Sequence, residues 1–502
     1  MIHPSFLFTD HAVLQRDREV RIWGKCDCTA LSVSYLTYTA FATVENGSFF
    51  ATLPAMPAGL VGDLIFSSDT ETLTLCDVVT GDVYLAGGQS NMEHPLFCTL
   101  YDDEDLVEDD GIRIFTVPRR PYEGADILGW HFQVLETKDT PWEIYQKETA
   151  LRFCAIGSYF AKRLRKDINV PIGIISCNWG ATITEAWIDR EKLLQTKLAR
   201  LEADDYDRAF GNIDMDAYQK EFDNFESKLK AYAAEHNAVA ESEAFGKTYI
   251  LFNGFHAQIP KGPYHYKTPG NLRHTMISRV TPLAMRGVLW YQGESNDKNT
   301  DPIDRKEWFR EVMDTLIADW RDAFQSPDLP FYIVQISAYP RGPKKALGKE
   351  WCDLRDVHEA LGLEKNIHTV VSIDVGEENN IHPADKKPIG ERLALAALAN
   401  EYGMDVPWQS PKIDRIDQQG DRLVLTFQNA TALHVKDDIP RGFFVTMADG
   451  TTKEAVASIC GATVHIPLEP NLTTIGYCNC NYAVANVYNE HGLPLFPFEK
   501  NI

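Results

Sequence analysis

The sequence predicts an α/β protein with a parallel, doubly wound sheet that is flanked by all-β domains. Between residues 81 and 403, short apolar runs alternate with amphipathic helical stretches, which is typical of a parallel sheet covered by helices. On either side of this segment, short strand-like runs are broken by Gly and Pro, as in small β domains. We therefore expect an N-terminal β-sandwich domain at 1–80, an α/β domain at 81–403 and a C-terminal β-rich domain at 404–502.

The two β domains are expected from runs that are rich in β-branched and aromatic residues. In the N-terminal domain these runs cover residues 20–24, 31–35 and 49–53. In the C-terminal domain they cover residues 422–427, 443–446 and 462–466, and Ala448-Asp449-Gly450 is an expected turn.

The α/β domain is expected to contain strands at 83–86, 172–176, 287–291, 331–336 and 369–374. Two sets of apolar residues recur at helical spacing: Phe153, Ile156, Phe160 and Leu164, and then Val312, Met313, Leu316, Ile317 and Trp320. An acidic helical insertion is expected at about 190–245, with Phe222, Phe225, Leu229 and Tyr232 on the face that packs on the main domain or forms a flap. In such sheets, functional sites form at the carboxyl ends of the strands.

Composition excludes several classes of function. The chain has 502 residues and a formal net charge of −23, which argues against nucleic acid or an anionic membrane surface as a partner. We find no signal peptide and no apolar run long enough to cross a membrane, so we expect a cytoplasmic protein. Two C-x-C pairs, Cys26/Cys28 and Cys478/Cys480, lack the usual zinc spacing and are expected to pack in cores.

One serine follows the first α/β strand. Residues 83–86 lead directly into Gly87-Gly88-Gln89-Ser90-Asn91. Ser90 could simply cap a helix, because Ser is a preferred N-cap residue. It could instead be a nucleophile at the end of a sheet, which would need a His base and oxyanion donors elsewhere in the chain.

Three further segments can supply those groups. Gly180 follows an apolar strand and opens an expected helix, so its N–H could be an oxyanion donor or the glycine could serve turn geometry alone. Gln292 follows the strand at 287–291 and could donate a side-chain N–H or only hold its loop, while Glu294 is expected to support that loop. His382 lies between the last α/β strand and a helix, whereas His94 is the rival base by sequence proximity and is expected to line the pocket.

Taken together, these segments resemble the sialate O-acetylesterase family of the SGNH hydrolase superfamily. The resemblance rests on HAVLQRD at 11–17, VRIWG at 20–24, GQSNM at 88–92, WYQGESN at 290–296, IHP at 381–383, GERLA at 390–394 and GLP at 492–494 with PF at 497–498. The blocks occur in the family's order and cover nearly the whole chain. The resemblance implies a flavodoxin-like SGNH-hydrolase sheet for residues 81–403.

The resemblance also implies an esterase that uses no metal or cofactor. Ser90 would be the nucleophile, His382 the general base, and the Ser90 N–H, the Gly180 N–H and the Gln292 side chain the oxyanion donors. Gln89, Asn91, His94 and Glu294 would support the pocket and its loops.

The His382 segment departs from the superfamily pattern. An Asp often stands three residues before the catalytic His, and here that position is Asn379. A backbone carbonyl near Asn380 could orient the ring instead, and Asp374 and Asp385 are alternatives without the expected spacing.

The resulting hypothesis is a serine-dependent carbohydrate O-acetylesterase that acts on O-acetylated sialic acids. One alternative is an esterase for acetylated xylan or another polysaccharide. Another is an inactive glycan-binding module, which the missing Asp favours and the presence of Ser90 and His382 opposes. The sequence predicts no oligomeric state.

Overall fold

The computed structural model describes residues 1–119, 141–240, 260–298, 300–341 and 346–502. It divides into two compact units, of which the first comprises residues 1–296 and 300–331 and the second residues 297–299 and 332–502. The predicted domain edges at 80/81 and 403/404 stay predictions.

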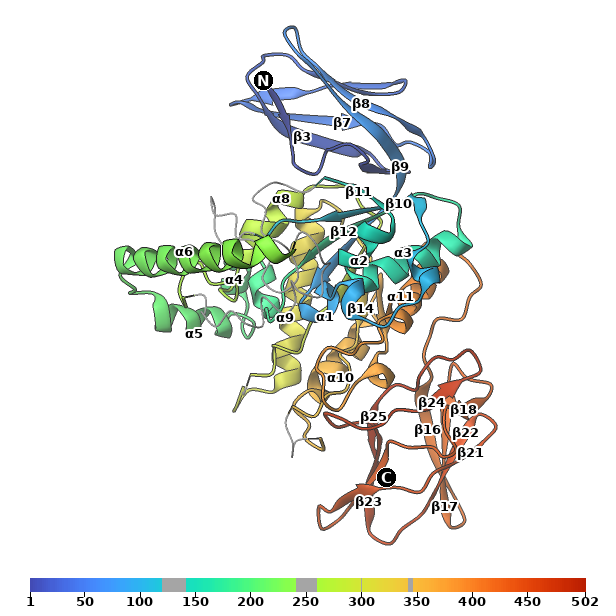
Figure 1. Ribbon diagram of the computed structural model, residues 1–502. Helices are drawn as coiled ribbons and strands as arrows, with labels where there is room; N and C mark the ends of the chain where they lie inside the picture. The colour runs from blue at the N-terminus through green and yellow to red at the C-terminus, as the bar shows by residue number, and fades with distance from the viewer. Residues whose placement is uncertain (120–140, 241–259, 299, 342–345) are drawn as a thin grey trace. The chain divides into compact units, whose positions relative to one another are not determined.

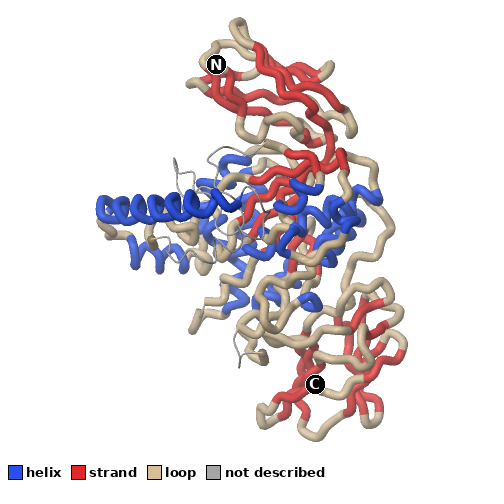
Figure 2. The backbone as a smooth tube through the Cα atoms, in the orientation of Figure 1, coloured by secondary structure: helices blue, strands red, loops and turns tan. Residues whose placement is uncertain are grey.

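Residues 1–89 contain only strands, turns and loops (Figure 2). The strands before the central sheet are β1 (Ile2–Pro4), β2 (Val13–Gln15), β3 (Val20–Cys26), β4 (Ser32–Tyr35), β5 (Tyr38–Phe41), β6 (Thr43–Glu45), β7 (Ser48–Leu53) and β8 (Val61–Ser67). One antiparallel sheet has the order β1-β3-β7-β6, and in a second sheet β4 pairs with β5 and β8. Buried and exposed residues alternate along β7, which is the pattern of a strand with one face on the core.

A long strand, β9 (Thr72–Gly88), joins this β region to the central sheet (Figure 1). Its first half pairs antiparallel with β8, and its last seven residues pair parallel with β12 (Ile172–Asn178). The sequence predicted only the apolar run at 83–86, because the earlier half of β9 alternates polar and apolar residues.

The central sheet of the first unit has the order β11-β10-β12-β9-β13, with β10 (Asp109–Thr116), β11 (Glu143–Tyr145) and β13 (Gly287–Tyr291). The strands β10, β12, β9 and β13 are parallel to their neighbours, whereas β11 is antiparallel to β10. The predicted parallel arrangement is thus confirmed for β10, β12, β9 and β13 and fails at β11, so the fold is a mixed α/β architecture with additional all-β sheets.

The helices of the first unit include α1 (Ser90–Glu93), α2 (Lys147–Arg152), α3 (Ala155–Asp167), α4 (Arg190–Gln195), α5 (Leu201–Phe210), α6 (Met215–Ala240), α8 (Ser278–Val280) and α9 (Arg305–Ala323). The short elements η1 (Leu96–Cys98), η2 (Asp103–Leu106) and η3 (Thr184–Trp187) are 3-10 helices, and η4 (Arg273–Ile277) is a π-helix. Ile156, Phe160 and Leu164 of α3 and all five predicted apolar positions of α9 are buried, which confirms the second helical period and most of the first. The first predicted position, Phe153, is buried but lies outside α3, as the extended residue that ends α2.

The predicted acidic insertion forms α4, α5 and α6. Phe222 and Phe225 of α6 are buried, as predicted for its packed face. The side chains of Leu229 and Tyr232, and residues 241–245 of the predicted insertion, lie outside the described part of the structure.

The second unit contains all but the first residue of β14 (Phe331–Val334), followed by α10 (Cys352–Leu361), β15 (Ile367–Val370), the 3-10 helix η5 (Ile373–Val375) and α11 (Lys387–Asn400). The predicted strand at 369–374 is wrong at its end, because the chain leaves β15 after Val370 and turns at η5. Residues 401–502 contain no helix (Figure 2).

The C-terminal strands are β16 (Lys412–Gln419), β17 (Arg422–Gln428), β18 (Leu433–Val435), β19 (Phe443–Met447), β20 (Thr452–Glu454), β21 (Ser458–Cys460), β22 (Thr463–Pro467), β23 (Leu472–Tyr477), β24 (Val487–Asn489) and β25 (Phe498–Asn501). They form the antiparallel sheets β16-β17-β22-β21, β18-β24 and β20-β19-β23-β25. Their inner faces share one core, in which Phe443, Tyr477 and Phe498 are in contact. All ten cysteines lie within the described residues and are free thiols. Within the described residues, no helix is both long and apolar enough to cross a bilayer.

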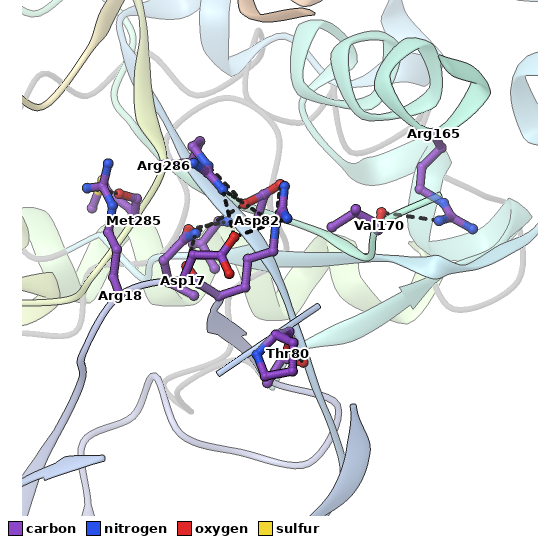
Figure 3. A network of polar contacts seen from close by, with 12 residues as sticks. Asp17, Arg18, Thr80, Asp82, Arg165, Val170, Met285 and Arg286 are labelled. Carbon is purple, nitrogen blue, oxygen red and sulfur yellow. Dashed lines mark hydrogen bonds and ion pairs between the residues drawn. The ribbon is translucent and has the colours of Figure 1, made fainter. Parts of the chain in front are cut away.

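A buried carboxylate fixes the middle of β9. The Asp82 side chain is fully buried and accepts hydrogen bonds from Gln15 at 3.1 Å, Arg16 at 3.0 Å and Arg286 at 2.9 Å (Figure 3). Burial alone would raise the pKa of the Asp82 carboxyl, but its contacts with Arg16 and Arg286 outweigh burial and lower it. Asp82 thus stays ionised and ties β9 to neighbouring segments at the end of the parallel sheet away from Ser90.

Candidate active site

Ser90 lies at the carboxyl end of β9. Gly88 adopts a φ of +135°, and a Cβ added there would lie 2.1 Å from the Tyr291 carbonyl oxygen, so the turn requires glycine. The Gln89 N–H donates to the Tyr291 carbonyl at 3.1 Å, and the Trp179 N–H donates to the Gly88 carbonyl at 3.1 Å. Gln89 occupies the N-cap position and Ser90 is the first residue of α1, so the interpretation of Ser90 as an N-cap is wrong.

Gln292 is fully buried beside this turn. Its Nε2 donates to Asn296 Oδ1 at 2.6 Å, to the Thr182 carbonyl at 3.1 Å and to Gln89 Oε1 at 3.3 Å. Its Oε1 accepts a hydrogen bond from the Thr184 hydroxyl. The predicted oxyanion amide is thus held in place by contacts from η3 and from its own loop.

Two buried carboxylates support the same network. Glu294 Oε1 accepts a hydrogen bond from Asn91 Nδ2 at 2.5 Å, which links the loop after β13 to α1. Glu185 Oε2 accepts from Asn296 Nδ2 at 2.8 Å. The hydrogen bond from Asn91 to Glu294 is consistent with the predicted role of Glu294 in supporting its loop.

Gly180 lies in a turn that Glu93 holds. The Gly180 N–H donates to Glu93 Oε2 at 2.5 Å, and Arg119 lies 2.5 Å from Glu93 Oε1. Burial raises the pKa of the Glu93 carboxyl above its ordinary value, because its effect exceeds the opposing effects of Arg119 and the Gly180 N–H. The expected helix start at Gly180 is wrong, because Ala181 adopts a φ of +60° and the next helix, η3, begins at Thr184.

His94 is buried at the C-terminal end of α1. Its N–H donates to the Ser90 carbonyl at 2.9 Å, and its own carbonyl accepts from the Ala155 N–H at 2.9 Å. These contacts anchor the end of α1 to the start of α3.

An aromatic pair stands next to the Gly180 turn. The Trp179 and Tyr266 rings are stacked, with centroids 5.6 Å apart and planes 9° apart, and Arg119 lies 5.8 Å from the centre of the Trp179 ring. Sequence reasoning missed Glu93, Arg119, Glu185, Asn296 and Tyr266. The sequence pointed only to two of these residues, because Asn296 ends the WYQGESN motif and Glu93 directly follows the GQSNM motif.

His382 lies in the second unit, in the loop between η5 and α11. Asn380 Oδ1 accepts from the His382 N–H at 3.0 Å, and Asn380 Nδ2 donates to the His382 carbonyl at 2.6 Å, so this side chain fixes the His382 backbone. Asn379 is exposed. Burial, and then the charge of Lys386, lower the pKa of His382 to about 4. The ring is therefore neutral at pH 7, as a general base must be.

Of the two alternative carboxylates, Asp374 is bound to other side chains. Asp374 forms two hydrogen bonds of 2.7 Å with Arg392 and accepts one of 3.3 Å from the Tyr488 hydroxyl. Burial raises the pKa of Asp385. Because Ser90 and His382 belong to different units, their pairing stays a prediction.

Comparison with known proteins points to one enzyme family. A model of the family described as "Carbohydrate esterase, sialic acid-specific acetylesterase" matches residues 262–399. Mouse sialate O-acetylesterase is 26% identical over 416 residues, which cover 77% of this chain and 69% of the mouse protein. The human sialate O-acetylesterase is 24% identical over 73% of this chain and 63% of its own length.

A solved structure extends the match to the whole chain. A carbohydrate acetylesterase from Xanthomonas citri superposes with a TM-score of 0.75 and 27% identity, covering 100% of this chain and 99% of that protein. The sequence and structure comparisons agree with each other and with the motifs. They confirm that the chain is a homologue of the sialate O-acetylesterase family of carbohydrate esterases.

Proposed function

We propose that this protein is a serine-dependent carbohydrate O-acetylesterase that removes acetyl groups from O-acetylated sialic acids. The match of residues 262–399 to the sialic acid-specific acetylesterase family carries the substrate assignment. The serine at the carboxyl end of a parallel strand supports an SGNH-type, flavodoxin-like arrangement, because sites in open α/β sheets form at that edge.

In the proposed mechanism, Ser90 Oγ attacks the acetyl carbonyl carbon while the His382 ring takes the hydroxyl proton. The tetrahedral intermediate collapses, the C–O bond to the sugar breaks, and His382 returns the proton to the leaving alkoxide. A water molecule, deprotonated by His382, then attacks the acetyl carbon of acetyl-Ser90, the bond to Ser90 Oγ breaks to release acetate, and His382 returns the proton to Oγ.

The proposed oxyanion donors are the Ser90 N–H, the Gly180 N–H and Gln292 Nε2. In the structure the Gly180 N–H donates to Glu93, and Gln292 Nε2 donates to Asn296. The oxyanion would share these donors with their present acceptors or displace them. The orientation of the His382 ring by a backbone carbonyl near Asn380 belongs to the same proposal.

A second candidate is an esterase for neutral acetylated polysaccharides such as xylan. It is favoured by the full-length match to an enzyme whose description specifies a carbohydrate acetylesterase without naming sialic acid. The two candidates share their chemistry and differ in the substrate.

The deciding experiment measures acetate release from a mono-O-acetylated sialic acid and, in parallel, from acetylated xylan fragments. Ser90→Ala and His382→Ala are the test variants. Ser176→Ala is the matched control, because Ser176 is a second buried serine, on the neighbouring strand β12. Release from the sialic acid that is lost in both variants and kept in the control supports the proposal.

Release from xylan alone would replace the substrate assignment. No release from either substrate by folded protein would favour the inactive glycan-binding module.

A further inference from the structure

A groove of about 460 Å³ lies in the C-terminal β region, entirely within the second unit. Three short segments line it: residues 406–409 before β16, residues 429–431 between β17 and β18, and residues 489–491 at the end of β24. Its volume is in the range of small-molecule sites. None of its lining residues belongs to the candidate active site.

Hydrogen bonds between the three segments hold the walls of the groove. Asn429 Nδ2 donates to the Ser410 carbonyl at 3.2 Å, and Asn489 Nδ2 donates to the Asn429 carbonyl at 2.9 Å. The Glu490 carboxylate accepts from the Thr431 hydroxyl at 2.7 Å and from the Thr431 N–H at 3.1 Å. Because the groove is preformed, ligand binding costs little conformational entropy of the protein.

Trp408 supplies a flat apolar surface to this polar groove. Its ring is half-buried and packs at 90° to the His368 ring, with centroids 5.5 Å apart. Burial lowers the pKa of His368 to about 4, so the imidazole that braces Trp408 is uncharged at pH 7. The Trp408 indole N–H donates no hydrogen bond to any of the described residues, which leaves a donor beside the apolar ring.

The other polar groups of the groove favour hydroxyl groups as partners. Gln409 is exposed, and its side-chain amide makes no hydrogen bond to the described part of the chain. Glu490 can accept from hydroxyl groups, while Gln409 and the Trp408 N–H can donate to them.

The charge of the groove disfavours anionic ligands. The hydrogen bond from the Thr431 hydroxyl, with further backbone donors, lowers the pKa of Glu490 to about 2, so this carboxylate is ionised at neutral pH. The lining contains no Lys or Arg, and its other ionisable group, His491, lies 3.5 Å from Glu490. Phosphates and the carboxylate of a sialic acid would therefore be repelled.

We propose that this groove is a saccharide-binding site for neutral sugar units, separate from the acetyl-ester site. The C–H face of a sugar ring would lie on Trp408, and its hydroxyl groups would bond to Gln409 and Glu490. Such a site holds the glycan that carries the ester and raises its effective concentration at the enzyme.

The test is a calorimetric titration of the full-length protein with xylotetraose and with N-acetyllactosamine, up to about 10 mM. 3′-Sialyllactose, which is anionic, is the comparison ligand. At least one neutral oligosaccharide is expected to bind, and more tightly than the anionic one. Trp408→Ala is expected to weaken binding at least about tenfold, Gln409→Ala severalfold, and Trp408→Phe less than Trp408→Ala.

Trp23→Ala is the matched control, because it removes another half-buried indole, from β3, and should leave binding unchanged. Hydrolysis of 4-nitrophenyl acetate should be unchanged in all these variants, which separates the groove from the proposed esterase function. The proposal is overturned if the parent protein binds neither neutral oligosaccharide, or if Trp408→Ala and Gln409→Ala bind as tightly as the parent.

Discussion

Glu93, the last residue of α1, connects this helix to the turn at Gly180, which is 87 residues away in the sequence. Its carboxylate lies on the same short helix as Ser90 and contacts both the Gly180 N–H and Arg119. Because the charges of Glu93 and Arg119 are buried, each depends on the other for compensation. Glu93 thus links the helix of the predicted nucleophile to a predicted oxyanion donor.

We predict that Glu93→Gln destabilises the protein by about 3–5 kcal/mol, because it leaves the Arg119 charge buried without a counterion. Urea-induced unfolding measures the loss. Glu143→Gln is the control, since the ion pair of Glu143 with Arg152 is about one-third exposed and should contribute at most about 1 kcal/mol. Equal losses in the two variants would contradict the role given to Glu93.

The lowered pKa of His382 predicts an unusual pH profile. A general base acts in its neutral form, so a pKa lowered to about 4 keeps His382 active well below the ordinary histidine pKa of about 6.5. The acid limb of kcat/KM is expected near pH 4 rather than near pH 6.5. Hydrolysis of 4-nitrophenyl acetate between about pH 3.5 and 8 measures it, and a limb near 6.5 would argue against a buried His382 as the base.

At the scale of elements, the turn that carries Ser90 depends on how closely β9 approaches β13. Gly88 has no room for a Cβ against the Tyr291 carbonyl, and the Gln89 N–H bonds to that same carbonyl. The position of Ser90 is therefore set by the pairing of two strands that are far apart in the sequence.

We predict that Gly88→Ala lowers kcat/KM by about a hundredfold or more, because a displacement of about 1 Å in a reacting group has that effect. Gly450→Ala is the control, because Gly450 also has a positive φ, of +84°, but its Cβ would meet nothing within 4 Å. The control should keep its activity and lose about 1 kcal/mol or more of stability. Activity assays with thermal unfolding compare the variants, and a fully active Gly88→Ala would contradict the prediction.

At the scale of the whole molecule, the net charge of −23 acts on charged substrates. A negative protein repels an anionic sialate at low salt, and salt screens that repulsion over a Debye length of about 10 Å at 0.1 M. We predict that kcat/KM for O-acetylated sialic acid rises severalfold between about 0.01 and 0.15 M NaCl, while kcat/KM for neutral acetylated xylan fragments stays nearly constant. If kcat/KM for O-acetylated sialic acid instead falls as salt rises, local positive charge at the site outweighs the net negative charge of the protein.

The sequence by itself determined the elements whose side-chain pattern is local. The apolar runs at 172–176 and 287–291 are strands β12 and β13, and the apolar positions of α9 are buried. Such patterns can be read from a sequence because they report which face of each element is buried. The motif around Ser90 likewise indicated the esterase family, to which the comparisons confirm homology.

Only the tertiary structure decided what each polar group contacts. The Gly180 N–H bonds to Glu93, Gln292 bonds to Asn296 and Thr182, and Asp374 binds Arg392. It also decided that Ala181 takes a positive φ, which prevents the helix expected at Gly180. The physical reason is that hydrogen bonds and charge pairs join residues far apart in the chain, so their partners depend on the packing of whole elements rather than on neighbouring residues.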